Sequence, residues 1–205
     1  NNMNYKSVLL PFGKTILQTQ TGQSVSNDSA FLFEQISRRI TQGDTTCLEL
    51  GSGNGIISIM LSHYHPKSKI TGIEFQPELA ELSKKNAESA EVFATFINAD
   101  LREYNSEDSF DLVFSNPPFF PVNSGKISPE PERAVSRHEI ECNMLDVLQC
   151  VKRNLCYNGT GLVLYPANRE SEFKKNAKKV DLKVVEQIVS ENSKTIIFVL
   201  KDIRE

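Results

Sequence analysis

The tetrapeptide Asn116-Pro117-Pro118-Phe119 has residue types that can hold a flat amino group for attack. The Asn116 side-chain oxygen and the Pro117 carbonyl oxygen can each accept one of its two N–H bonds, and Phe119 can stack on the planar group. The two prolines stiffen the loop, so these acceptors are placed in advance. The pattern indicates chemistry at the nitrogen of an amide or an exocyclic amine. Taken alone, it is equally compatible with a proline-rich turn that carries a surface aromatic.

A second motif upstream indicates a nucleoside cofactor. After Glu49, glycines stand at every second position: Gly51, Gly53 and Gly55. This stretch lies between a predicted apolar strand (46–50) and a predicted apolar helix (56–63). Such glycines let the backbone pass close to a ligand, but their spacing is not that of the NAD-binding pattern. Glu74 lies at the end of the next predicted strand and Asp100 at the end of the one after it. There they can accept hydrogen bonds from ribose hydroxyls and from an adenine amino group, respectively.

The elements that must position these residues alternate between strands and helices, which predicts a parallel sheet. Residues 110–115 form a buried strand that the prolines at 117 and 118 must stop. The seven predicted strands of the sheet are 46–50, 69–75, 92–97, 110–115, 161–165, 182–189 and 195–200. The predicted helices run from Asn27-Asp28-Ser29 to Gly43, over 56–63, from Pro77 onwards, from His138 to about Tyr157, and over 169–180.

Length and pattern predict one domain over residues 1–205. Residues 1–41 form an N-terminal extension, and residues 42–205 form the catalytic core. In the extension, residues 15–20 and 23–25 read as a small hairpin with a turn at Thr21-Gly22, ahead of the first helix. This hairpin and helix either roof a site or simply pack at the edge of the sheet.

The composition of the sequence limits the cellular location and the binding partners that we expect for this protein. No apolar run is long enough to span a membrane, and the N-terminus lacks the apolar core of a signal peptide, so we expect a cytoplasmic protein. The four cysteines form no C-x-x-C pair, which favours free thiols over a disulfide framework, and we expect no metal. The net charge of −3 is unusual for a protein that binds nucleic acid, so positive charge for such a partner must be local.

The arrangement from Glu49 to Phe119 resembles the class I S-adenosylmethionine-dependent methyltransferases that methylate amino groups. The resemblance implies an α/β fold: a Rossmann-like seven-stranded sheet with helices on both faces and an antiparallel last strand, plus the small N-terminal hairpin and helix. It implies S-adenosylmethionine as cofactor and a catalytic motif of Asn116, Pro117, Pro118 and Phe119. The implied cofactor-binding residues are Glu49, Gly51, Ser52, Gly53, Asn54, Gly55, Glu74, Phe75, Asp100, Leu101 and Asn116.

Nearly the whole chain is similar to the tRNA adenine-N6 methyltransferases that modify adenine 37 of a valine tRNA. The similarity includes the polar segment 26–29, the aromatic pair after the prolines, and a loop that ends in Arg137-His138-Glu139. It implies methylation of adenine N6 in tRNA. Three alternatives stay open: a HemK-type glutamine N5-methyltransferase, another RNA or DNA base amino-methyltransferase, and a non-catalytic scaffold that only binds the cofactor.

For a tRNA partner, the candidate RNA-contacting residues lie in the loop after the motif. They are Phe120, Lys126, Arg133, Arg137 and His138. A base buried in a duplex cannot reach the motif, so the substrate base must lie in a loop or be extruded. Four lysines at 174, 175, 178 and 179 are spaced as a solvated helix face. We expect a monomer, with a dimer as the alternative.

Overall fold

The computed structural model describes residues 4–19, 27–41, 43–117 and 142–204. Its centre is a seven-stranded sheet in the order β5-β4-β3-β6-β7-β9-β8. The strands from β5 to β7 are parallel, whereas β9 runs antiparallel to both β7 and β8, as predicted. The strands are β3 (Thr46–Leu50), β4 (Lys69–Glu74), β5 (Ala94–Asn98), β6 (Phe110–Ser115), β7 (Leu155–Pro166), β8 (Leu182–Val189) and β9 (Thr195–Asp202).

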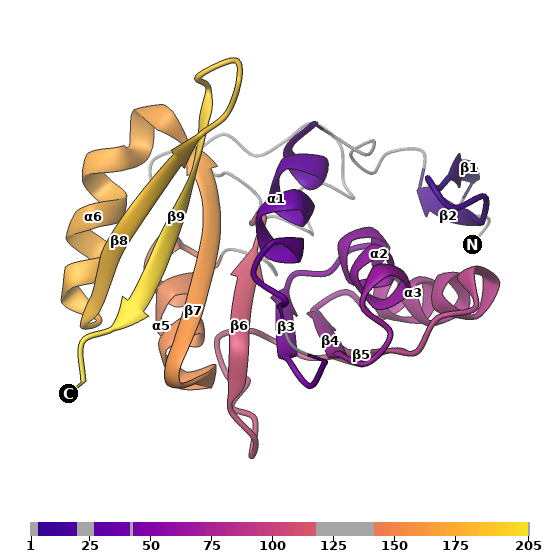
Figure 1. Ribbon diagram of the computed structural model, residues 1–205, viewed down its shortest axis with the longest axis horizontal. Coiled ribbons are helices and arrows are strands. Elements are labelled where there is room, and N and C mark those ends of the chain that lie inside the picture. The colour runs from indigo at the N-terminus through magenta and orange to yellow at the C-terminus, as the bar shows by residue number, and fades with distance from the viewer. Residues whose placement is uncertain (1–3, 20–26, 42, 118–141, 205) are drawn as a thin grey trace.

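Helices cover both faces of the sheet (Figure 1). Side chains of β6 alternate between the faces, with Leu112 and Phe114 in one apolar cluster and Val113 in the other. The first cluster includes α1 (Asn27–Ser37), α2 (Ile56–Tyr64) and α3 (Pro77–Ala90). The second includes α5 (Met144–Asn154) and α6 (Glu170–Lys179), which the short 3-10 helix η1 (Ala167–Arg169) precedes. The predicted Rossmann-like architecture is therefore confirmed.

The N-terminal hairpin that the structure describes is formed by a pair of strands that we did not predict. β1 (Tyr5–Leu9) pairs antiparallel with β2 (Thr15–Thr19), so the partner of β2 precedes it in the chain. The turn suits this pairing because Gly13 takes a φ of 82° and its N–H bonds to the Leu10 carbonyl. Residues 20–26, which include the turn that we predicted, lie outside the described residues.

The helix predicted from His138 to Tyr157 is shorter at its C-terminal end. α5 begins after Asn143, whose side chain accepts the N–H of Asp146 at 2.8 Å in a capping box. It ends at Asn154, and the next three residues belong to β7, where Leu155 pairs with Phe110 of β6. From Leu155 onwards the chain therefore pairs with the sheet, although its apolar spacing is helical. Residues 138–141 lie outside the described part of the chain.

The first helix also ends earlier than the predicted Gly43. α1 stops at Ser37, and the following N–H groups of Arg39 and Ile40 bond three residues back, which tightens the chain into a turn. Ile40 is still buried in the first apolar cluster. Its helical spacing therefore reflected burial in the core and not a continued helix.

Candidate functional site

The carboxyl ends of four parallel strands lie level with one another at one edge of the sheet. Leu50 of β3 pairs with Ile73 of β4 on one side and with Ser115 of β6 on the other. Glu74 of β4 pairs in turn with Asn98 of β5. Ligands of open parallel sheets bind outside this edge. The residues that follow these strands are the predicted site residues, so the fold assembles them here.

The glycine loop (residues 51–55) follows β3 and has an open side and a packed side. Gly51, Gly53 and Gly55 have φ angles of 71°, 56° and 88°, which disfavour other residues. Apart from the glycine itself and its two chain neighbours, no described residue has a heavy atom within 4 Å of a Cβ built at Gly51 or Gly53. A Cβ at Gly55 would lie 2.8 Å from the ring of Phe96. The loop therefore rests on Phe96 and leaves space beside its first two glycines for a ligand.

Glu74, at the end of β4, holds the glycine loop. Its Oε1 accepts the Gly53 N–H at 2.9 Å, and its Oε2 accepts the Gln76 N–H at 2.9 Å. Burial raises the pKa of Glu74, while these backbone hydrogen bonds act in the opposite direction. Each carboxylate oxygen keeps a further lone pair, so the side chain can still accept from ligand hydroxyls.

Glu49 belongs to β3 and precedes the glycine loop by two residues. Its side chain is buried and accepts the Ser58 hydroxyl of α2 at 2.7 Å. Burial raises the pKa of Glu49 to about 8, and the nearby charge of Glu74 acts in the same direction. Burial therefore favours the protonated form of Glu49, and a cationic group nearby would favour its ionised form.

Asp100 follows β5 and is paired in a way that the sequence pattern did not predict. Arg102 donates from Nε to both carboxylate oxygens at 3.0 Å and from Nη2 to Oδ2 at 2.7 Å. Hydrogen bonding from Arg102 lowers the pKa of Asp100. Asn98 ties the neighbouring strand end in place by donating to the Glu74 and Phe75 carbonyls at 2.9 and 2.8 Å.

The start of the Asn-Pro-Pro-Phe motif adjoins the glycine loop. Ser115 donates its hydroxyl to the Leu50 carbonyl at 2.9 Å, so the last residue of β6 is fastened to the residue before Gly51. Asn116 is half-buried and Pro117 is buried. The remaining predicted catalytic and RNA-contacting residues lie outside the described residues: Pro118, Phe119, Phe120, Lys126, Arg133, Arg137 and His138.

The other predicted cofactor residues are close to the loop but differ in exposure. Ser52 is buried, and its hydroxyl has no hydrogen-bond partner among the described residues. The Asn54 side chain accepts the Ile56 N–H at 3.2 Å at the start of α2. Phe75 and Leu101 are half-buried, and Leu101 packs against the second apolar cluster. The Ser52 side chain lies on the packed side of the loop, where its Cβ would be 2.8 Å from a Cβ built at Gly72 of β4.

Three side chains that support the site were not predicted from sequence as site residues. Ser83 of α3 donates its hydroxyl to the Gly53 carbonyl at 2.7 Å, and Asn86 donates to the Asn54 carbonyl at 2.9 Å. Phe96 lies under Gly55. The available signal was a polar residue on the apolar face of the third helix, since Asn86 is 1% exposed.

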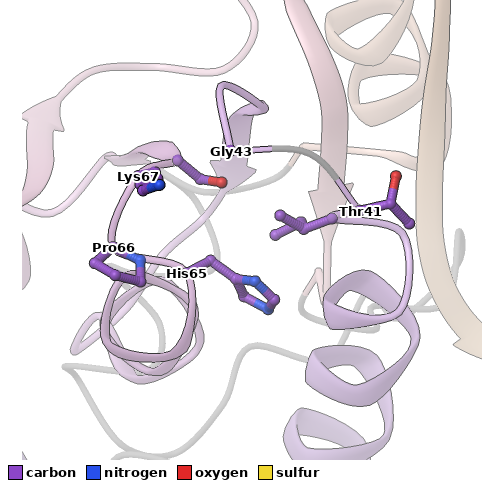
Figure 2. Close-up of a pocket in the computed structure, with 7 residues that line it drawn as sticks. Thr41, Gly43, His65, Pro66 and Lys67 are labelled. Carbon is purple, nitrogen blue, oxygen red and sulfur yellow. The ribbon is translucent and has the colours of Figure 1, made fainter.

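A pocket of 270 Å³ lies elsewhere, at the opposite ends of β3 and β4. Figure 2 shows the His65 ring pointing into it, with Thr41 and Pro66 on either side. The Ser37 Oγ atom lies 2.7 Å from His65 Nε2, within hydrogen-bond distance. The pocket is lined by Ile40, Thr41, Gly43, His65, Pro66, Lys67 and Ser68. None of these is a predicted site residue, so this pocket is separate from the glycine-loop site.

Three further observations concern the cysteines, possible metal ligands and the helices of the described residues. All four cysteines are free; Cys47 and Cys150 are buried, and Cys142 and Cys156 are half-buried. Within the described residues, no cluster of three His, Cys, Asp or Glu side chains is arranged to hold a metal ion. No helix in the described ranges is both long and apolar enough to cross a membrane.

The sheet order and the strand-end site define the class I methyltransferase fold. A methyltransferase from Pyrococcus furiosus shares the fold with a TM-score of 0.68 and 18% identity, over 93% of this chain and 89% of that one. A T. thermophilus 16S rRNA N2 methyltransferase in complex with AdoMet and guanosine has a TM-score of 0.68 and 15% identity, over 97% of this chain and 50% of that one. The methyltransferase small domain family model matches residues 21–127, and the chain belongs to this family.

The similar sequences carry a more specific name. A tRNA1(Val) (adenine(37)-N6)-methyltransferase of Porphyromonas gingivalis is 35% identical over 111 residues, which are 51% of this chain and 42% of that protein. A protein of the same name from Dyadobacter fermentans is 23% identical over 176 residues, covering 85% of this chain and 71% of that protein. The chain thus matches less than half of the length of the P. gingivalis relative.

Proposed function

We propose that this protein is an S-adenosylmethionine-dependent N-methyltransferase that methylates the exocyclic N6 of adenine 37 in tRNA. The observation that carries the proposal is the Ser115 hydrogen bond to Leu50, which sets Asn116 beside the glycine loop. A cofactor cradle and an amine-holding motif are thereby adjacent. Membership of the methyltransferase small domain family and the names of the similar sequences support the same assignment.

The residues at the strand ends fit S-adenosylmethionine. Glu74 keeps free lone pairs for the ribose hydroxyls, and Asp100 is the acceptor proposed for the adenine amino group. The glycine loop offers open space beside Gly51 and Gly53. Glu49 would favour a cationic ammonium group, which would draw its carboxyl into the ionised form. The cofactor supplies an electrophilic methyl group.

The motif residues act on the acceptor nitrogen. An exocyclic amine is weakly nucleophilic because its lone pair is delocalised into the ring. By accepting both N–H bonds, the Asn116 side chain and the Pro117 carbonyl favour a more tetrahedral nitrogen with an available lone pair. Positioning and electrostatics then provide most of the catalysis, and no general base with a shifted pKa is needed. Phe119 stacks on the base in this proposal.

An assay with two substrates tests the assignment. Radiolabelled S-adenosylmethionine is incubated with the protein and, in parallel, with unmodified total tRNA and with a release factor. Label recovered as N6-methyladenosine after nuclease digestion of the tRNA is the expected result. Label in the release factor alone would transfer the function to glutamine methylation at the same site. If the cofactor binds and neither substrate is labelled, the proposed tRNA substrate is wrong, and a different nucleic-acid substrate or a binding scaffold gains support.

A further inference from the structure

Asn86 connects two parts of the chain that are far apart in sequence. Its side-chain oxygen accepts the Leu17 N–H at 2.9 Å, and its Nδ2 donates to the Leu17 carbonyl at 2.9 Å. The same Nδ2 donates to the Asn54 carbonyl of the glycine loop, also at 2.9 Å. Asn86 is 1% exposed whereas Leu17 is exposed, so the three hydrogen bonds are partly buried. One side chain therefore holds the N-terminal hairpin and the glycine loop at the same time.

The contact with the hairpin resembles the pairing of a strand. The hairpin contains two strands, so one edge of β2 has no backbone partner in it. The N–H and C=O of Leu17 lie on that edge, and the Asn86 amide satisfies both, as a residue of a third strand would. The hairpin lies beside α2 and α3 in Figure 1. Its position thus depends on an amide that also bonds to the glycine loop.

Other side chains contact either the hairpin or the glycine loop, but not both. Substitutions at these side chains can therefore disturb one of the two without the other. The Ser83 hydroxyl bonds to the Gly53 carbonyl in the loop and to the Leu79 carbonyl of its own helix. Lys14, in the turn of the hairpin, forms an exposed ion pair with Glu91 at the end of α3. The Phe12 ring stacks on His63 of α2, with ring centroids 3.7 Å apart. Among these side chains, Asn86 alone bonds to both the hairpin and the loop.

We propose that Asn86 is a positioning residue that couples the docking of the N-terminal hairpin to cofactor binding at the glycine loop. The inference rests on the proposed function for the identity of the ligand. A ligand that orders the loop fixes the Asn54 carbonyl, which orients the Asn86 amide and strengthens its hold on Leu17. Because such coupling is reciprocal, a docked hairpin increases cofactor affinity by the same factor.

The Asn86→Asp variant tests the coupling with S-adenosylhomocysteine as the ligand. The carboxylate has nearly the same shape and still accepts the Leu17 N–H, but it cannot donate to the Leu17 and Asn54 carbonyls. In the wild type, we expect the ligand to slow amide hydrogen exchange in residues 15–19. In the variant, exchange there should be faster and should no longer respond to the ligand. The dissociation constant should rise by about tenfold, which is within the usual range of coupling between sites.

Two matched variants act as controls. Ser83→Ala loosens the loop but leaves the Asn86 link intact, so saturating ligand should still slow exchange in residues 15–19. Lys14→Ala loosens the hairpin from outside the site and should raise the dissociation constant by about threefold through the coupling. If Asn86→Asp does not fold, as judged by circular dichroism, the Lys14→Ala result decides the test. Unchanged binding would then overturn the proposal.

The other outcomes separate the coupling from the proposed function. If Asn86→Asp exchanges faster in the hairpin but binds S-adenosylhomocysteine like the wild type, the coupling is wrong and the proposed function stands. The same conclusion follows if the ligand binds the wild type without changing exchange in residues 15–19. If the wild type does not bind the ligand, the proposed function itself is overturned, and the coupling with it.

Discussion

The carboxylate of Glu74 accepts the backbone N–H of Gly53 at a distance of 2.9 Å. The acid at the end of β4 and the glycine loop after β3 are therefore one structural unit. A residue that the sequence pattern assigns to ligand binding therefore also shapes the loop that we propose to bind the same ligand. Substitutions at this edge of the sheet should therefore change loop conformation and cofactor affinity together.

Glu74→Gln should weaken the binding of S-adenosylhomocysteine by about tenfold or more. A glutamine has one side-chain acceptor oxygen, so it cannot accept the N–H groups of Gly53 and Gln76 together. Leaving one of these donors unpaired should also lower the free energy of unfolding by about 1 kcal/mol. Calorimetric titration and urea unfolding measure the two effects. The exposed Glu88→Gln on α3 is the control, and equal affinities for the two variants would contradict the prediction.

Without cofactor, the protein should lose stability as the pH rises from 5 to 8. The pKa of Glu49 is raised from an ordinary value of 4.5 to about 8 in the fold. Its contribution is therefore fully present below about pH 4.5 and is lost as the pH rises through about 8, because the folded state holds a proton that the unfolded chain has released. Urea unfolding at several pH values measures this slope. Glu49→Gln should flatten it, leaving the smaller contribution of Glu74, whose pKa is also raised.

Asp100→Asn should change the selectivity for the base of the cofactor. A carboxylate accepts a hydrogen bond from the amino group of adenine but repels the carbonyl oxygen of hypoxanthine. The wild type should therefore prefer S-adenosylhomocysteine to S-inosylhomocysteine by about tenfold or more. The variant offers an N–H donor and should discriminate by less than about threefold. A variant that keeps the full preference would show that Asp100 serves only to pair with Arg102; the neighbouring, exposed Glu103→Gln is the control.

Two glycine substitutions should separate backbone strain from packing. Gly13 and Gly55 have φ angles of 82° and 88°, so alanine is strained at both positions. Gly13→Ala should cost about 1–2 kcal/mol of folding stability, since no described atom would contact the new methyl group. Gly55→Ala should cost a further 1–3 kcal/mol or so, because the methyl group meets the Phe96 ring. Urea unfolding tests this difference, and equal costs would mean that the ring moves away freely.

Asn116→Ala should lower the rate of methyl transfer by about 100-fold or more under single-turnover conditions. The substitution removes an acceptor for the substrate amine and leaves the Ser115 link to the loop in place. The dissociation constant of S-adenosylhomocysteine should change by less than about fivefold, because most of its proposed contacts come from other strand ends. Ser115→Ala provides the comparison, as it removes the link and keeps the acceptor. An unchanged rate in Asn116→Ala would show that the motif does not hold the amine.

Residues that lie beside a strand end could be placed from the sequence. The glycine loop, Glu74 and Asn116 each follow an apolar strand directly, and parallel strands bring their carboxyl ends to one edge. The order of strands and helices could also be predicted, because hydrophobic periodicity and the residues that stop an element act over short stretches of chain. Together, these local signals determined the fold class and the position of the site.

Contacts between distant segments depended on the tertiary structure. The pairing of β2 with β1 was not predicted, because it depends on packing that periodicity does not encode. The Asn86 bonds to Leu17 and Asn54 and the placement of Phe96 under Gly55 join residues that lie in different elements. Such contacts form because elements packed by their apolar faces must still pair their buried polar groups. The sequence by itself determined which residues stand at the sheet edge, and the tertiary structure decided which side chains hold them there.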